Sequence, residues 1–203
     1  MERRGEKERK TKETAVRVTV NLDGKGDYQV KTPIPFFNHM LELFGKHSLM
    51  DIKVEASGDV EVDYHHTVED VGITLGEAIS QALGGREGVS RYGEATVPMD
   101  EALVSVAVDL GGRPYLVINL FGQGEGGPDR YSAKAGDFDL NLLEIFFSAI
   151  AQKLSANLHV NLHYGSDPHH ISEAAFKAFA RSMMEATRIN PRIQGVLSTK
   201  GII

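Results

Sequence analysis

A short motif occurs twice in this chain, and the repeat limits the folds that the sequence can adopt. The pattern His-His-x-x-Glu is found at residues 65–69 and again at residues 169–173. When the two copies are aligned, Asp63 also matches Asp167, so the surrounding segments share more than the motif. Elements predicted from hydrophobic periodicity recur around each copy in the order strand, strand, helix, strand, helix. The sequence therefore predicts an α+β fold made of two similar sheet-and-helix halves.

The order of the predicted elements also sets the expected boundaries along the chain. Residues 13–92 form the first half, residues 93–190 form the second, and residues 191–203 form a tail that contributes to the site. Residues 1–12 contain nine charged residues and no apolar run. We expect them to form a mobile arm, because such a segment has little apolar surface to bury.

Within the first half, residues 15–22 alternate between apolar and polar side chains and predict a half-buried strand. Residues 28–32 are expected to return as its hairpin partner, and residues 60–62 as a further short strand. A helix is predicted over residues 36–47. In the second half, residues 122–136 are predicted to be a glycine-rich loop.

Composition restricts the class of protein. Hydrophobic residues make up 41% and charged residues 25% of the 203 positions, which is typical of a globular chain with a packed core. No apolar run reaches the length of a membrane span, and the N-terminus is too charged for a signal peptide, so a cytoplasmic protein is expected. A net charge of −6 argues against general nucleic-acid binding.

The absence of cysteine decides which metals the motif can bind. With no thiolate available, a metal must be held by imidazole nitrogen and carboxylate oxygen. These ligands suit manganese, iron, cobalt, nickel or zinc. In each motif the two histidines lie three and four residues before the glutamate, so the side chains share one helix face.

Adjacent histidines on a helix point about 100° apart, so one motif can reach two metal ions. Four histidines and two glutamates are enough for a dinuclear site, or for two mononuclear sites at a subunit boundary. His39 lies on the predicted helix 36–47 and is placed to add a ligand. Asp63 and Asp167 are interpreted as helix caps, or as partners that orient the imidazoles.

Other polar residues are weaker candidates. His47 follows His39 by two helical turns, His159 is either structural or part of a site, and His163 is expected to be exposed. Glu13 precedes the first strand, where a solvated charge is its simplest interpretation. Donors that could bind a phosphate are scattered along the chain, at Arg91, Arg113, Lys177, Ser198 and Lys200.

Longer segments give the chain a resemblance to imidazoleglycerol-phosphate dehydratase of histidine biosynthesis, over nearly all of its length from Thr11 onward. The segments that carry the resemblance are TKET at 11–14, FFNHML at 36–41, DYHHTVED at 63–70, RYG at 91–93, MDEA at 99–102, GRP at 112–114, HHISEAAFKA at 169–178 and STKG at 198–201.

The resemblance implies a fold similar to domain 2 of ribosomal protein S5. It also implies a lyase that removes water from D-erythro-imidazole glycerol phosphate to give imidazole acetol phosphate. Two Mn²⁺ ions are expected per active site, in a cytoplasmic homo-oligomer of 24 subunits by resemblance, with sites at subunit contacts. No nucleic acid or membrane partner is expected.

The family resemblance further implies roles for individual residues. The implied metal ligands are His39, His65, His66, Glu69, His169, His170 and Glu173. The implied contacts to the phosphate ester substrate are Glu13, His47, Arg91, Arg113, Lys177, Ser198 and Lys200. Because the hydrogen to be removed from carbon is not acidic, a metal on each side of the imidazole ring would stabilise the developing charge. Glu13 would move the proton.

Three positions depart from the family pattern. Asn38 stands where an aspartate is usual, and Asp167 where an asparagine is usual. Ile145 stands where many members have a histidine that corresponds to His39. Glu144 could substitute for it, one metal could have fewer protein ligands, or water could complete the coordination.

Two other functions are compatible with the motif itself. The first is a dinuclear metallohydrolase that acts on a phosphoester. The second is a non-enzymatic oligomer that binds metal for storage or structure. Only the hydrolase would release inorganic phosphate, and only the storage protein would have no use for the cationic residues.

Overall fold

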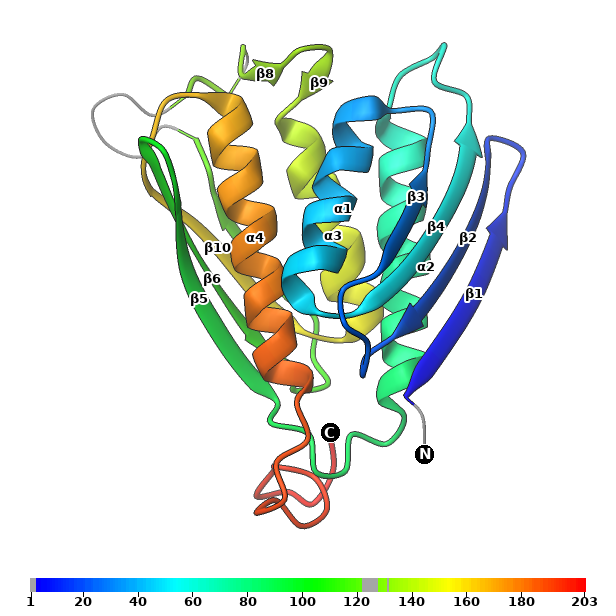
Figure 1. Cartoon of the computed structure of the whole chain (residues 1–203), viewed down its shortest axis with the longest axis vertical. Helices are drawn as coiled ribbons and strands as arrows, with labels where there is room; N and C mark the ends of the chain where they lie inside the picture. Colours follow the sequence, from blue (N-terminus) through cyan, green and yellow to red (C-terminus); the bar gives the residue numbers. More distant parts are fainter. Residues whose placement is uncertain (1–2, 122–127, 131) are drawn as a thin grey trace.

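Two four-stranded sheets flank a layer of four helices in the computed structural model, which describes residues 3–121, 128–130 and 132–203 (Figure 1). The first half contains β1 (Arg4–Lys10), β2 (Thr14–Asn21), β3 (Tyr28–Lys31), α1 (Pro35–Ser48), β4 (Asp51–Gly58) and α2 (His65–Leu83). The second half contains β5 (Tyr92–Met99), β6 (Ala102–Asp109), β7 (Tyr115–Asn119), β8 (Lys134–Ala135), β9 (Phe138–Asp139), α3 (Asn141–Leu154), β10 (Asn157–Tyr164) and α4 (Pro168–Thr187).

The two halves have the same sheet topology. The strand order is β1-β2-β4-β3 in the first sheet and β5-β6-β10-β7 in the second. In each sheet the last pair, β3 with β4 or β7 with β10, is parallel, and the other pairs are antiparallel. The predicted α+β fold with duplicated halves is therefore confirmed.

The helices of the two halves alternate in the central layer. α1 packs against α4 of the other half, and α2 packs against α3. Aromatic rings fill these contacts, with centroids 5.2 Å apart for Phe44 and Phe179 and 5.4 Å apart for Phe37 and Phe146. Along the described chain, none of the helices has the length and hydrophobicity needed to cross a membrane.

The prediction of a mobile arm at residues 1–12 is wrong, because Arg4–Lys10 is the edge strand β1. Its residues pair with β2 along their whole length. The inward positions carry Gly5, Lys7 and Arg9 in place of apolar residues, which is why no hydrophobic alternation was visible. Arg9 is held instead by an ion pair with Asp70 of α2, at 2.7 Å. A charged edge strand of this kind also resists pairing with other chains.

A glycine lets the first strand of each half lie directly against a helix backbone. A Cβ added to Gly5 would lie 1.9 Å from the carbonyl oxygen of Ala78 in α2. At Gly93 it would lie 2.0 Å from the carbonyl oxygen of Ser182 in α4. The same close approach in both halves shows that β1 and β5 are repeat equivalents. Each half therefore begins with a strand that the predicted element order lacks.

Three smaller predictions also need correction or lie partly outside the structure. Residues 28–32 do not form a hairpin with β2, because β3 pairs in parallel with β4. Residues 60–62 lie in a turn before α2 and form no strand. Within the predicted loop at 122–136, residues 122–127 and 131 lie outside the described residues. The last part of that loop contains the short strand β8.

We predict that Gly5→Ala and Gly93→Ala each lower the free energy of unfolding by about 1–3 kcal/mol, because the added methyl group must push the strand away from its helix. Urea unfolding measured by circular dichroism would test this. Lys10→Ala, at an exposed position of β1, is the control and should change stability by no more than about 0.5 kcal/mol. A glycine variant as stable as the control would contradict the close packing.

Candidate metal centre

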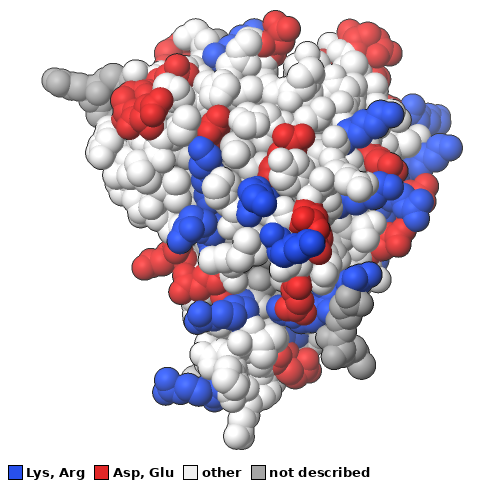
Figure 2. Space-filling model, in the orientation of Figure 1, with Lys and Arg blue, Asp and Glu red and all other residues white. Residues whose placement is uncertain are grey.

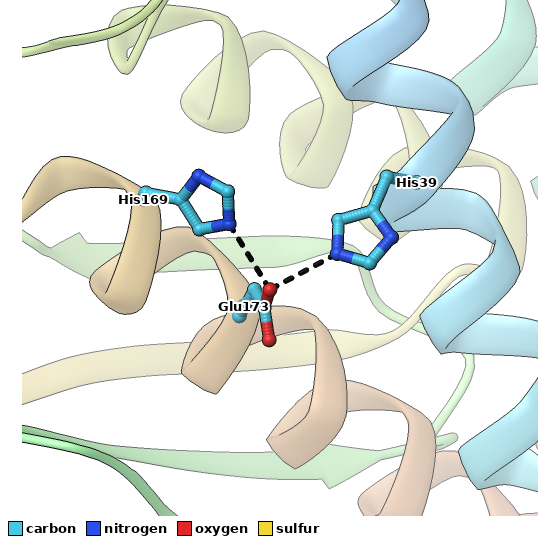
Figure 3. Close-up of side chains that lie close together, drawn as sticks. All are labelled: His39, His169 and Glu173. Carbon is cyan, nitrogen blue, oxygen red and sulfur yellow. Dashed lines mark hydrogen bonds and ion pairs between the residues drawn. The ribbon is translucent and has the colours of Figure 1, made fainter.

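Three potential metal ligands converge between α1 and α4 (Figure 3). The Nε2 atoms of His39 and His169 lie 3.0 and 3.1 Å from the same oxygen, Oε1 of Glu173. All three ligand atoms lie within 4.8 Å of one another. Two imidazole nitrogens and a carboxylate oxygen at this spacing fit a divalent cation such as manganese, iron or zinc.

Local helix geometry positions each of these side chains. Pro35 occupies the first turn of α1, where its missing N–H is tolerated, and His39 follows one turn later. His169 and Glu173 are four residues apart on α4, so their side chains lie on one face. The ring of Phe36 packs edge-on against the ring of His169, with centroids 5.2 Å apart. Contacts between the two halves thus fix the position of the imidazole.

Glu173 is buried and charged. Burial alone would raise the pKa of its carboxyl group, but hydrogen bonds from Lys177, His39 and His169 outweigh that effect and lower the pKa to about 2. Lys177 Nζ donates to Oε2 of Glu173 at 2.6 Å, which leaves Oε1 facing the histidines. Lys177 therefore supports the metal cluster and does not lie with the other predicted phosphate donors.

The first motif is less complete in the single chain. His65 Nε2 lies 4.0 Å from Oε2 of Glu69, and among the described residues no third ligand joins them at the spacing of the α4 cluster. α1 and α3 lie between this motif at the start of α2 and the one at the start of α4 (Figure 1). The two motifs of one chain therefore do not form a shared site.

The position that corresponds to His39 is indeed occupied by Ile145. Each residue is the fifth of its helix, α1 or α3, and α3 packs against α2 as α1 packs against α4. Glu144, the proposed substitute, forms an ion pair with Arg130. The α2 motif thus lacks the ligand that completes the α4 cluster.

The second histidine of each motif contacts a carboxylate that sequence reasoning missed. His66 Nδ1 lies 3.0 Å from Asp59, and His170 Nδ1 lies 2.6 Å from Glu101. The backbone N–H of Asp167 and, next in size, the hydrogen bond with the ring of His170 lower the pKa of the Glu101 carboxyl group to about 2. Spacing gave no indication of Glu101, which is far from His170 in the sequence.

Of the two aspartates interpreted as helix caps, Asp167 is the N-cap of α4, whereas Asp63 precedes Tyr64, the N-cap of α2. The side chain of Asp63 accepts a hydrogen bond from the backbone N–H of His65, and that of Asp167 accepts one from His169, both at 2.8 Å. Asn38, the other departure from the family pattern, exchanges two hydrogen bonds with the backbone of Thr32. An aspartate at this position could only accept.

Glu13 lies in the turn between β1 and β2, close to the first motif. Its backbone N–H donates to Thr11 Oγ1 at 3.1 Å, and its side chain is exposed. The pKa of His66 is raised chiefly by the hydrogen bond to Asp59, against some desolvation, and the negative charge of Glu13 contributes. The structure therefore brings Glu13 near the α2 motif.

Four predicted phosphate donors line one surface pocket of about 910 Å³ at the C-terminal tail, namely Arg91, Arg113, Ser198 and Lys200. Arg91 is already engaged there, because it binds Asp109 through two nitrogens and donates to the carbonyl of Leu197 at 2.7 Å. Its immediate role is to hold the tail against β6. The exposed side chains of Arg113 and Lys200 are the better placed cations.

The remaining histidines lie elsewhere. His47 is near Lys177 in the α1–α4 contact, where burial, followed by the positive charges of Lys177 and Arg181, lowers its pKa. His159 and His163 lie on the outer face of β10, and His163 Nε2 is 2.9 Å from Ser105 Oγ. His159 and His163 are therefore separated from the metal cluster by the sheet.

Comparison with known proteins decides the family. The profile for imidazoleglycerol-phosphate dehydratase matches residues 32–183, which include both motifs. The chain belongs to the imidazoleglycerol-phosphate dehydratase family. The family named from the sequence segments is thereby confirmed, and with it a lyase of histidine biosynthesis. The metallohydrolase and storage alternatives are set aside.

Similar proteins cover the chain almost completely. Imidazoleglycerol-phosphate dehydratase of Pelobacter propionicus is 52% identical and aligns with 97% of this chain and 96% of its own. Imidazoleglycerol-phosphate dehydratase of Geobacter sulfurreducens is 50% identical and aligns with 99% of this chain and 99% of its own. The crystal structure of the Staphylococcus aureus enzyme, 34% identical, superposes with a TM-score of 0.78 over 92% of this chain and 99% of its own.

We predict that His39→Ala lowers the affinity of the protein for Mn²⁺ or Co²⁺ by roughly a hundredfold or more. Even partners that only orient a ligand change metal affinity by about 10–100-fold, so loss of a direct ligand should cost at least as much. Titration followed by Mn²⁺ electron paramagnetic resonance would measure this. His159→Ala removes an imidazole outside the cluster and should bind as the parent does. Equal affinity of the His39 variant and the parent would exclude the cluster as a metal site.

Proposed function

We propose that both His-His-x-x-Glu motifs bind the metal ions used in the dehydration of imidazole glycerol phosphate, with Mn²⁺ as the metal and two ions per active site. The convergence of His39, His169 and Glu173 is the observation that carries this proposal. Imidazole and carboxylate ligands suit Mn²⁺, and His65, His66, Glu69 and His170 supply the remaining ligands. When bound, the ions would polarise the imidazole ring of the substrate and stabilise negative charge on it.

The reaction removes a proton from one carbon and hydroxide from its neighbour, and the resulting enol converts to the ketone of imidazole acetol phosphate. We assign proton transfer to the carboxylate of Glu13. It is exposed and lies near the α2 motif where the ring would bind. The chain thus supplies the base from the β1–β2 turn.

The phosphate is assigned to the tail pocket, chiefly to Arg113, Ser198 and Lys200. Arginine offers a planar pair of donors and lysine a point charge for such a group. The pocket lies beyond the C-terminal end of α4, whereas the metal cluster lies at its N-terminal end (Figure 1). α4 has 20 residues and so a length of about 30 Å.

Imidazole glycerol phosphate is a small molecule, much shorter than α4, so it cannot reach both the metal cluster and the tail pocket of one chain. We therefore propose that a complete active site combines the metal-binding motifs and the phosphate pocket of different copies of the chain. The separation of the two motifs within one chain supports the same arrangement. A homo-oligomer of 24 subunits in the cytoplasm is the assembly expected from the family resemblance.

The outer faces of the two sheets differ in a way that supports this assembly. On the first sheet, outward positions carry Glu6, Arg17, Lys53 and Glu55. Figure 2 shows more charged side chains over this sheet, at right, than over the flank of the second sheet at left. The outward face of the second sheet carries fewer charges, because Glu94 is surrounded there by Thr96, Ser105, Ala107, Asn119 and Asn161.

A face depleted in charge, continuous with the tail pocket through Tyr92, is suited to contact between copies. We propose that the outer face of the second sheet packs against a second copy of the chain, and that the first sheet faces solvent.

We predict that Glu13→Gln lowers kcat for dehydration by about 10²–10⁴-fold, because the amide cannot accept the proton. Product formation by the Mn²⁺-loaded oligomer would be measured at saturating substrate. Lys12→Gln, a charge change in the same turn, is the control and should leave kcat within a few-fold. Unchanged turnover in the Glu13 variant would remove this residue from the proposed mechanism.

We predict that Ala107→Arg produces smaller assemblies than the parent, since it places a charge at the centre of the proposed contact face. Thr19→Arg makes the same change at the corresponding position of β2 on the first sheet and should leave the assembly intact. Sedimentation velocity would compare the two. An intact Ala107 variant, or dissociation of the Thr19 variant alone, would contradict the choice of face.

A further inference from the structure

Two glutamates occupy the same place in the two halves but have different contacts. The hairpins β1–β2 and β5–β6 have the same register. Gly5 pairs with Val20 as Gly93 pairs with Val108, and Lys10 pairs with Ala15 as Pro98 pairs with Leu103. Glu13, in the turn of the first hairpin, therefore corresponds to Glu101 in the turn of the second. Glu13 is the residue assigned above to proton transfer, and Glu101 has no assigned role.

Both carboxylate oxygens of Glu101 are engaged. Oε2 lies 2.6 Å from Nδ1 of His170, and Oε1 accepts backbone hydrogen bonds from Asp167 at 2.8 Å and Ser166 at 3.2 Å. These contacts join the β5–β6 turn to the segment that begins α4. Glu101 therefore fixes both the ring of His170 and the start of the helix that carries it.

In the first half, a different residue makes the corresponding contact. Nδ1 of His66 lies 3.0 and 3.3 Å from the two oxygens of Asp59, in the turn after β4. By the sheet registers Ser57, which pairs with Ala15, corresponds to Tyr164, which pairs with Leu103, so Asp59 corresponds to Ser166 and has no carboxylate counterpart. Among the described residues, the Glu13 carboxylate has no hydrogen-bond or ion-pair partner.

We propose that Asp59 and Glu101 are positioning residues that orient the second histidine of each motif toward metal, and that the contact made by Asp59 leaves Glu13 available to the substrate. The proposal rests on the proposed function. A carboxylate that accepts the Nδ1–H of an imidazole fixes its tautomer, so that the Nε2 lone pair is presented to the metal.

The geometry of the histidine pairs agrees with this assignment. The rings of His65 and His66 are inclined at 76°, and those of His169 and His170 at 77°. The two lone pairs of each motif therefore point in different directions and can serve different ions. Asp100 lies 3.6 Å from Nε2 of His170, but its side chain is 71% exposed, so a metal ion can displace it.

The test compares the two corresponding glutamates. Glu101→Ala should lower Mn²⁺ affinity by about 10–100-fold, with Glu101→Gln less affected because it keeps an acceptor, and kcat at saturating Mn²⁺ should stay within a few-fold of the parent. Asp59→Ala should behave like Glu101→Ala. Glu13→Gln should do the opposite, with unchanged Mn²⁺ affinity and a large loss of kcat.

Asp100→Asn is the matched control, because it alters the neighbouring carboxylate and should change neither quantity. Thermal melting of the metal-free proteins would show whether each variant is folded. Parent-like Mn²⁺ affinity in folded Glu101→Ala would overturn the proposal, as would a loss of affinity in Glu13→Gln equal to that in Glu101→Ala. Because the affinities are measured without substrate, they test the positioning role even if the parent shows no dehydratase activity.

Discussion

The packing of α1 from the first half against α4 from the second is the contact on which the candidate metal centre depends. Stacked rings such as those of Phe44 and Phe179 fix the two helices side by side. His39 then reaches Glu173, although the two residues are far apart in the sequence. Neither half could form this cluster alone, so the duplication supplies the site as well as the fold. Hydrogen bonds from Lys177, His39 and His169 outweigh burial and keep the carboxylate of Glu173 charged, as a metal ligand must be.

Duplication produced equivalent positions, and divergence gave them different chemistry. The fifth residue of α1 is a metal ligand, whereas the fifth residue of α3 is Ile145. The hairpin glutamates diverged in a similar way, because Glu101 holds an imidazole and Glu13 is left exposed. The two halves therefore share a fold but contribute unequal parts of the proposed site. The unequal halves, and the distance from the metal cluster to the tail pocket, both favour a site assembled from several copies.

The sequence alone predicted the helices and the motifs well, because helical periodicity and a repeated spacing are local features. It missed β1 for a physical reason, since the inward positions of that strand carry Gly5, Lys7 and Arg9 and show no hydrophobic alternation. It also missed β5, although the inward residues of that strand, from Gly93 to Met99, are apolar. It also missed Glu101, because the contact with His170 depends on how a hairpin turn meets a distant helix. Once β1 and β5 are aligned, Glu101 corresponds to Glu13 and can be recognised. The placement of Lys177 beside Glu173, away from the tail pocket, likewise depends on tertiary structure.

The central claim is that two metal-binding motifs and a phosphate pocket from different copies of the chain form one active site. A crystal structure of the Mn²⁺-loaded oligomer with a triazole phosphonate in place of the substrate tests it most directly, with anomalous scattering used to locate the metal. The account predicts one manganese peak among His39, His169 and Glu173, a second peak at the α2 motif of a neighbouring copy, and the phosphonate on Arg113 and Lys200 of another chain. A ligand bound within a single chain, or no anomalous peak at His39, would contradict it.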